Sequence, residues 1–193
     1  SHSGIVVPAK TLTIPDWTSW MSDVRNQGQC YSCWVQASTA VTEALLHHQA
    51  NTNLQIDLRD STVPSACSTG FASSALDYIK TYRINSTEGS YPNYSGARWG
   101  LSQFSTVTGV NEIKAALENS PVTAVFWVYS DFQDFLDSHS TQAYSPNSTS
   151  YQTSARHAVA IVSYDNNGWI CRNSQGTVPG YGGGFVKIAF GVA

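Results

Sequence analysis

The sequence has few charged side chains. Asp, Glu, Lys and Arg together make up 12% of its 193 residues, about half the share of roughly 25% found in ordinary globular proteins. The formal net charge is −3, and Lys and Arg do not cluster anywhere along the chain. A surface for nucleic acid or for an anionic membrane needs such a cluster. We therefore expect neither nucleic acid nor membrane among the partners of this protein.

Long apolar runs are also missing. No stretch approaches the roughly 18 consecutive apolar residues of a transmembrane helix, and residues 1–10 contain no apolar signal-peptide core. Internal repeats and low-complexity linkers are absent as well. We therefore expect a mature chain that forms a single domain over residues 1–193, long enough to build two small lobes around a cleft.

Cysteine is scarce, with four residues in the whole chain. Cys30 and Cys33 form a Cys-x-x-Cys pair, which in other proteins carries out thiol–disulfide exchange when both thiols are available. A zinc site from Cys30, Cys33, Cys67 and a His would need a second close pair of ligands, and the sequence has none. We expect no metal and no cofactor. Cys171 lies in an apolar stretch and is interpreted as a buried, inert thiol.

The most informative stretch runs from Gln27 to Ala50. From Cys33 onward, apolar residues recur three and four positions apart without an intervening Pro or Gly, which predicts a helix from Cys33 to about Ala50. Cys33 would then lie at the helix N-terminus, where unpaired N–H groups and the helix dipole favour negative charge. A thiol in that position ionises more readily, and the thiolate is the nucleophilic form.

The rest of the pattern places helices first and strands second. Shorter helices are predicted at 72–82 and 111–117, and strands at 122–129, 157–164, 168–172 and 185–190. This order is typical of an α+β fold. We expect a helical lobe over about residues 15–104 and an antiparallel, β-barrel-like lobe over about 105–193, with residues 1–14 packed on the second lobe.

Three motifs resemble the papain-like cysteine proteases, the papain and cathepsin type of clan CA. Residues 30–34, Cys-Tyr-Ser-Cys-Trp, depart from the family signature around the nucleophilic Cys only at Tyr31. His157 opens an apolar run and Asn173 opens an Asn-Ser-Gln-Gly motif, in the order that the family requires. The resemblance covers residues 14–191 and implies a two-lobe α+β fold with the active site in the cleft between the lobes.

The resemblance implies a role for each of four residues. Cys33 would attack the peptide carbonyl and form a thioester acyl-enzyme, and His157 would pair with the thiolate and protonate the leaving amine. Asn173 would orient the imidazole. Gln27 and the backbone N–H of Cys33 would form the oxyanion hole. The implied activity is that of a cysteine endopeptidase acting on peptide and protein substrates.

The same resemblance implies how the surroundings are built. Cys30 would be joined to Cys67 in a disulfide. Gly70 would bind the backbone of an extended substrate, and Tyr31 would lie beside the substrate path. The pocket for the second residue before the scissile bond would be roomy and hydrophobic. Its walls would be small, apolar residues: Ala72, Val125, Ala155 and Ala158.

The family resemblance also implies how the protein is synthesised, where it is located and which proteins inhibit it. We expect synthesis as an inactive zymogen with a pro-segment, inhibition by proteins of the cystatin type, and a secreted or lysosome-like location. We expect the protein to be a monomer.

Two alternatives to a competent protease stay open. One is a papain-like fold kept as a binding or inhibitory module with weakened catalysis, because Gln175 replaces the family's Trp near Asn173 and Tyr31 replaces a Gly. The other is thiol–disulfide exchange through Cys30 and Cys33, which leaves the His and Asn motifs unexplained. A further departure is Arg156, directly before the His. A cation there should lower the pKa of the imidazole.

Overall fold

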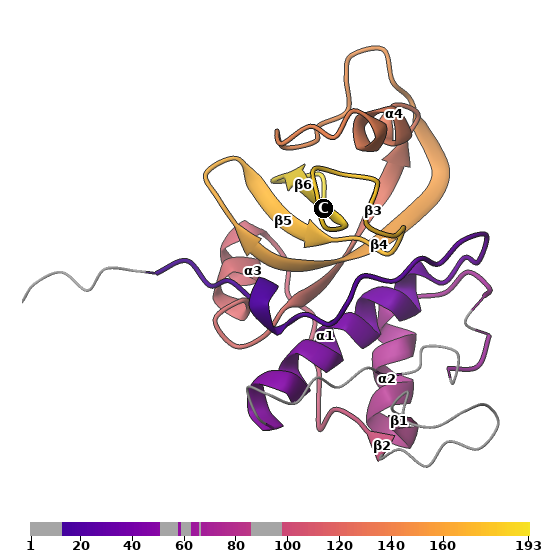
Figure 1. Cartoon of the computed structure of the whole chain (residues 1–193), viewed down its shortest axis with the longest axis vertical. Helices are drawn as coiled ribbons and strands as arrows, with labels where there is room; N and C mark the ends of the chain where they lie inside the picture. The colour runs from indigo at the N-terminus through magenta and orange to yellow at the C-terminus, as the bar shows by residue number, and fades with distance from the viewer. Residues whose placement is uncertain (1–12, 51–57, 59–62, 66, 86–97) are drawn as a thin grey trace, which may run out of the picture.

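The computed structural model describes residues 13–50, 58, 63–65, 67–85 and 98–193. Helices α1 and α2 gather with β1 and β2 on one side of the molecule, and strands β3 to β6 lie on the other (Figure 1). A one-turn 3₁₀ helix, Thr18–Trp20, precedes them. The helices and strands in chain order are α1 (Cys33–Ala50), α2 (Ala72–Tyr82), β1 (Ile84–Asn85), β2 (Arg98–Trp99), α3 (Val110–Ala116), β3 (Val122–Tyr129), α4 (Phe132–Asp137), β4 (Gln152–Tyr164), β5 (Gly168–Arg172) and β6 (Phe185–Ala189).

The predicted α+β fold is confirmed, with few differences in its elements. The hairpin of β1 and β2 and the short helix α4 were not predicted, because runs of two and six residues carry no readable periodicity. Strand β4 begins at Gln152 instead of His157. Residues 152–156 are almost all exposed and polar, so this end of the strand lacks the apolar signal that marked the remainder.

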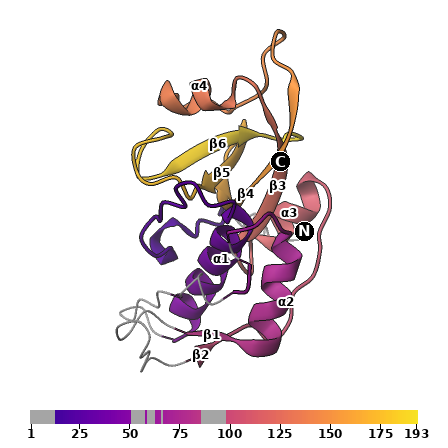
Figure 2. The ribbon, with the colours of Figure 1, turned by 90° about the vertical axis from the view of Figure 1, so that its right-hand side faces the viewer.

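The main sheet is antiparallel, with the strand order β3-β4-β5-β6. The pairing of β3 with β4 joins Val125 to Ala158 and Phe126 to His157. The described strands form an open sheet of four and do not close into a barrel, although Tyr144 adds a parallel bridge to Ile188 in β6. Figure 2 shows the sheet edge-on, with α4 beyond β6.

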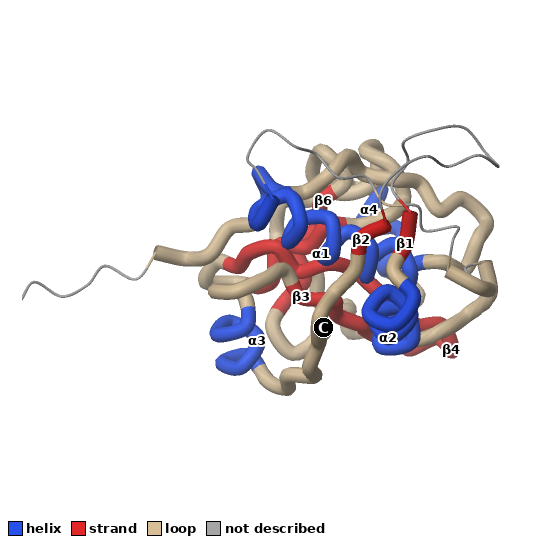
Figure 3. Tube along the Cα trace, turned by 90° about the horizontal axis from the view of Figure 1, so that it is seen from below, coloured by secondary structure: helices blue, strands red, loops and turns tan. Residues whose placement is uncertain are grey.

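Helix α1 is buried on both sides. Seen from below, it lies across the strands with α2 beside it (Figure 3). Ala40, Val41 and Ala44 belong to the core beneath the sheet, whereas Trp34 and Val35 belong to a second core with residues of α2. Hydroxyl groups inside the helix donate to carbonyls one turn earlier, as Thr42 does to Ser38, so these buried hydroxyls are satisfied.

The segment from residue 15 to 27 runs along the sheet. The backbone N–H of Trp17 donates to the Val162 carbonyl at 2.9 Å, and its indole N–H donates to the Leu117 carbonyl at 2.7 Å. Further along, the Gln27 N–H donates to the Ser174 carbonyl at 2.8 Å. This segment, which the expected lobe boundary assigns to the helices, therefore brings Gln27 to the end of β5. None of the helices in the described residues is long and apolar enough to span a bilayer.

Candidate active site

Cys33 is the first residue of α1, as predicted, and carries a free, half-buried thiol. The turn before it is closed by the Cys30–Cys67 disulfide, which confirms the pairing that the family resemblance implied. Two hydrogen bonds reinforce the closure. The N–H of Tyr31 donates to the Cys67 carbonyl at 3.2 Å, and the Trp34 indole donates to the Ser68 carbonyl at 2.8 Å. The helix start that presents the thiol is thus fixed from both flanks.

His157 lies in β4, and Asn173 directly follows the adjacent strand β5, so their side chains meet. The Nε2 of His157 lies 2.7 Å from the Oδ1 of Asn173. The same Oδ1 accepts the backbone N–H of Ser174 at 2.9 Å, and a backbone N–H can only donate, so the orientation of the amide is determined. Nε2 must therefore carry a proton. In the neutral imidazole Nδ1 is then the basic nitrogen, and no hydrogen bond from the described residues occupies it.

The imidazole is enclosed by aromatic rings. His157 is 7% exposed and Asn173 4%. The ring of Phe126 in β3 meets the imidazole edge-on at 5.8 Å between centroids, and Phe132 in α4 lies at 6.3 Å. The family's Trp is a Gln175 here, so in this chain these two phenylalanines supply aromatic cover for the histidine.

Burial sets the charge preference of the histidine. It lowers the pKa of His157 below the ordinary value of 6.5, and the hydrogen bond to Asn173 opposes this only in part. The sequence predicted the direction but attributed it to Arg156. That attribution is wrong, because the Arg156 side chain is exposed and its guanidinium lies over the rings of Phe71 and Trp127.

Gln27 is held in place by Ser174 and Cys30. Its Nε2 donates to the Cys30 carbonyl at 2.9 Å, and its Oε1 accepts the Ser174 hydroxyl at 2.6 Å. One amide N–H of Gln27 remains for a further acceptor. Ser174 thus links Gln27 to Asn173 through its hydroxyl, its carbonyl and its N–H. Ser174 was not predicted to have a role, and its place directly after Asn173 is the only signal for it in the sequence.

The residues predicted to contact substrate come from α2, β3 and β4 and from the segments before α1 and α2. Gly70 precedes α2, and a Cβ there would come within 2.6 Å of the Trp34 ring, so a side chain cannot be accommodated without a shift. Val125 and Ala158 pair across β3 and β4. The remaining predicted contacts are the buried Ala72 at the start of α2, the exposed Ala155 where the β3–β4 register shifts, and Tyr31, which is 67% exposed.

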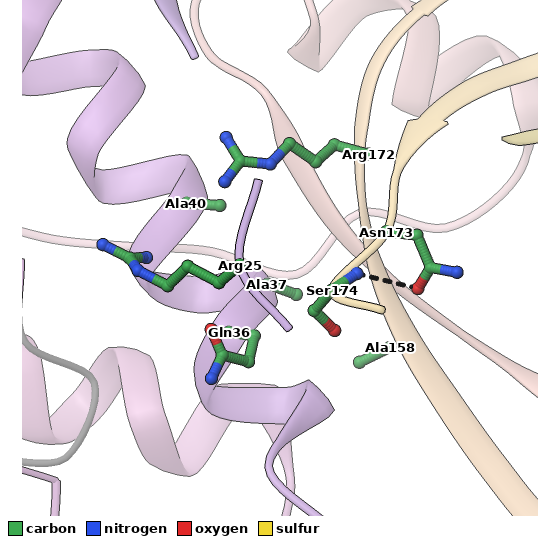
Figure 4. A pocket seen from close by; sticks show the side chains of 8 residues that line it. All are labelled: Arg25, Gln36, Ala37, Ala40, Ala158, Arg172, Asn173 and Ser174. Carbon is green, nitrogen blue, oxygen red and sulfur yellow. Dashed lines mark hydrogen bonds between the residues drawn. The ribbon is translucent and has the colours of Figure 1, made fainter. Parts of the chain in front are cut away.

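The packing of α1 against strands β4 and β5 leaves almost no space. A cavity of about 10 Å³ lies there, far smaller than any substrate side chain. Figure 4 shows Ala37 and Ala40 of α1 directed at the end of β5. Small residues therefore let the helix that carries Cys33 approach strands β4 and β5, which position His157 and Asn173. The lining residues are Arg25, Gln36, Ala37, Ala40, Ala158, Arg172, Asn173 and Ser174.

Comparisons with known proteins agree with this geometry. Residues 13–193 match the family model described as papain family cysteine protease. Fruit bromelain of Ananas comosus is 29% identical, over 92% of this chain and 55% of its own length. Two solved structures are each 25% identical with a TM-score of 0.72. The match to a cysteine protease of Carica candamarcensis in complex with E-64 spans 92% of this chain and 89% of that chain. The match to digestive procathepsin L 3 of Tenebrio molitor spans 97% of this chain and 67% of that chain.

The chain spans about half the length of the curated relatives that it matches, from 40% to 64% of the first three. The family model, in contrast, covers nearly all of this chain. This chain belongs to the papain family of cysteine proteases.

Proposed function

We propose that this protein is a cysteine endopeptidase that uses Cys33, His157 and Asn173, with Gln27 and the Cys33 N–H as the oxyanion hole. The observation that carries the proposal is the hydrogen bond from His157 Nε2 to Asn173, whose amide orientation is set by the Ser174 N–H. That arrangement leaves Nδ1 as the imidazole's basic nitrogen, which is the atom needed to take a proton from a thiol.

The reaction follows from these groups. His157 accepts the thiol proton, and the Cys33 sulfur attacks the peptide carbonyl. The resulting oxyanion is stabilised by the free N–H of the Gln27 amide and by the helix N-terminus. The C–N bond then breaks, and the imidazolium returns the proton to the leaving amine. Water, deprotonated by His157, attacks the thioester, which releases the carboxylic acid product and restores the thiol.

The lowered pKa of His157 bears on the resting state. Burial disfavours the imidazolium form of His157. An ion pair with Cys33 therefore forms only if the negative charge of the thiolate offsets the solvation that the imidazolium loses. In the described residues no hydrogen bond joins the Cys33 thiol to His157. We propose that the pair forms when substrate brings the two groups together, since catalytic hydrogen bonds often tighten only in the complex.

We extend the proposal to the expected biological setting. A secreted or lysosome-like compartment fits the Cys30–Cys67 disulfide, because such bonds persist in oxidising environments. Synthesis with a pro-segment is supported by the likeness to the Tenebrio procathepsin. A single peptidase domain of two lobes, a monomeric state and inhibition by cystatin-type proteins remain predictions.

The disulfide also weighs against the alternative of thiol–disulfide exchange. That chemistry needs both thiols of the Cys-x-x-Cys pair, and Cys30 is bonded to Cys67 while Cys33 is free. The binding-module alternative is distinguished by turnover: peptide binding without hydrolysis would be its mark.

The proposal is tested by intact mass and peptide mapping after incubation with E-64. We expect one adduct, on Cys33, and none in Cys33→Ala, which should also fail to hydrolyse peptides. Cys171 is an internal control, because it is fully buried and burial raises the pKa of its thiol. Hydrolysis by Cys33→Ala, or a folded protein whose reduced Cys33 takes up no inhibitor, would contradict the proposal.

A further inference from the structure

Arg156 lies between two aromatic rings that come from different parts of the molecule. Its guanidinium carbon is 5.2 Å from the ring centroid of Phe71, just before α2, and 5.2 Å from that of Trp127, in β3. Phe71 is 58% exposed and Trp127 43%. Cation–π contacts hold the guanidinium over the ring faces, so Arg156 is placed at the surface by the structure and does not extend freely into solvent.

Among the described residues, no carboxylate balances the charge of Arg156. Within the described residues the side chain has no ion pair and no hydrogen bond, and its guanidinium lies over the two rings. Contacts with ring faces use none of the five guanidinium N–H donors. A positively charged donor group is therefore presented to solvent in a molecule whose formal net charge is −3.

The position of Arg156 relates it to the proposed substrate pocket. Arg156 pairs with Trp127 across the sheet, and the next pair on that face is Val125 with Ala158. Val125 and Ala158 are two proposed walls of the pocket for the second residue before the scissile bond. Phe71, the other ring, stands between Gly70 and Ala72, which are proposed to contact the same part of a substrate. The guanidinium thus lies between β3 and the segment before α2, which carry residues proposed for two sides of this pocket.

We infer that Arg156 makes this pocket select an acidic side chain, Glu in particular, at the second residue before the scissile bond. The inference rests on the proposed endopeptidase function. A carboxylate can accept two parallel N–H bonds from a guanidinium, a geometry that an ammonium or a neutral amide does not match. The Phe71 and Trp127 rings and the small apolar walls would accommodate the methylene groups of Glu.

The test compares fluorogenic peptides that differ only at that position, with Glu, Gln, Leu or Lys. For each enzyme the readout is the ratio of kcat/KM for Glu to that for Gln, two side chains of nearly equal shape. In the wild type we expect a ratio of about three to ten, as for a partly exposed charged pair. The ratio should decrease as NaCl is added, because salt screens such pairs. It should fall to about one in Arg156→Gln.

Two further variants separate a specific contact from a general effect of charge. Arg156→Glu should reverse the preference, so that the Lys peptide is cleaved better than the Glu peptide. Lys114→Gln is the matched control: it removes one positive charge from α3, where Lys114 lies over the rings of Tyr164 and Phe190, and should leave the Glu to Gln ratio unchanged.

Each outcome bears on one claim. A ratio near one in a wild-type enzyme that cleaves the Leu peptide would overturn the specificity and leave the endopeptidase function standing. A ratio that persists in Arg156→Gln would overturn the role of Arg156. Failure to cleave any of the four peptides would contradict the endopeptidase function, and this inference with it.

Discussion

Ser174 offers the sharpest test of how the site is held together. Ser174→Ala removes the hydroxyl that donates to Gln27 Oε1 at 2.6 Å and keeps the backbone N–H that holds Asn173. A neutral hydrogen bond is worth about 1 kcal/mol net, or about fivefold in rate if all of it supports the transition state. Gln27 would still be tied by its Nε2 to Cys30. We therefore expect kcat/KM to fall about two- to fivefold.

Gln27→Ala should cost far more, because it removes the oxyanion donor itself. Loss of one such donor lowers kcat by about 100- to 1000-fold in well-studied enzymes. If the Ser174 hydroxyl acts only through the Gln27 amide, it has nothing to support once that amide is gone. The double variant should then match Gln27→Ala alone, so the two effects would not multiply.

The measurement is kcat/KM on one fluorogenic peptide for the four members of this cycle. Denaturant unfolding of each variant serves as the control, since a folded fraction below one would mimic a loss of activity. Effects of Ser174→Ala and Gln27→Ala that multiply in the double variant would refute the linkage. A Ser174→Ala enzyme as active as the wild type would refute the positioning role altogether.

Two predictions concern stability. Because burial lowers the pKa of His157, the unfolded chain takes up a proton first as the pH drops below about 6.5. The free energy of unfolding should decrease as the pH drops from about 6.5 to the pKa of His157 in the folded protein. Urea unfolding at several pH values should show a smaller decrease for His157→Gln than for the wild type. Equal decreases would contradict this prediction. Replacing Cys30 and Cys67 by Ala removes the disulfide that joins two residues 37 positions apart. It should lower the free energy of unfolding by about 3–4 kcal/mol; no change in the denaturant midpoint would exclude a stabilising disulfide.

Local patterns predicted many of the elements closely. Helix α1 was located from its apolar spacing, and strands β3 and β5 from their β-branched or aromatic residues and the turn residues that bound them. The missed elements are short, and the exposed half of β4 has no apolar face to read. The predicted barrel-like closure is not found among the described strands, because closure depends on pairings between distant segments that local patterns do not contain.

By itself, the sequence determined the order of helices and strands, the position of Cys33 at a helix start and, through its motifs, the family. These are local properties of neighbouring residues. Only the tertiary structure decided which groups meet: Ser174 with Gln27 across 147 positions, and Arg156 between the rings of Phe71 and Trp127. It also decided that burial, and not the neighbouring cation, lowers the pKa of His157. Such contacts join residues far apart in the chain, so no local pattern contains them.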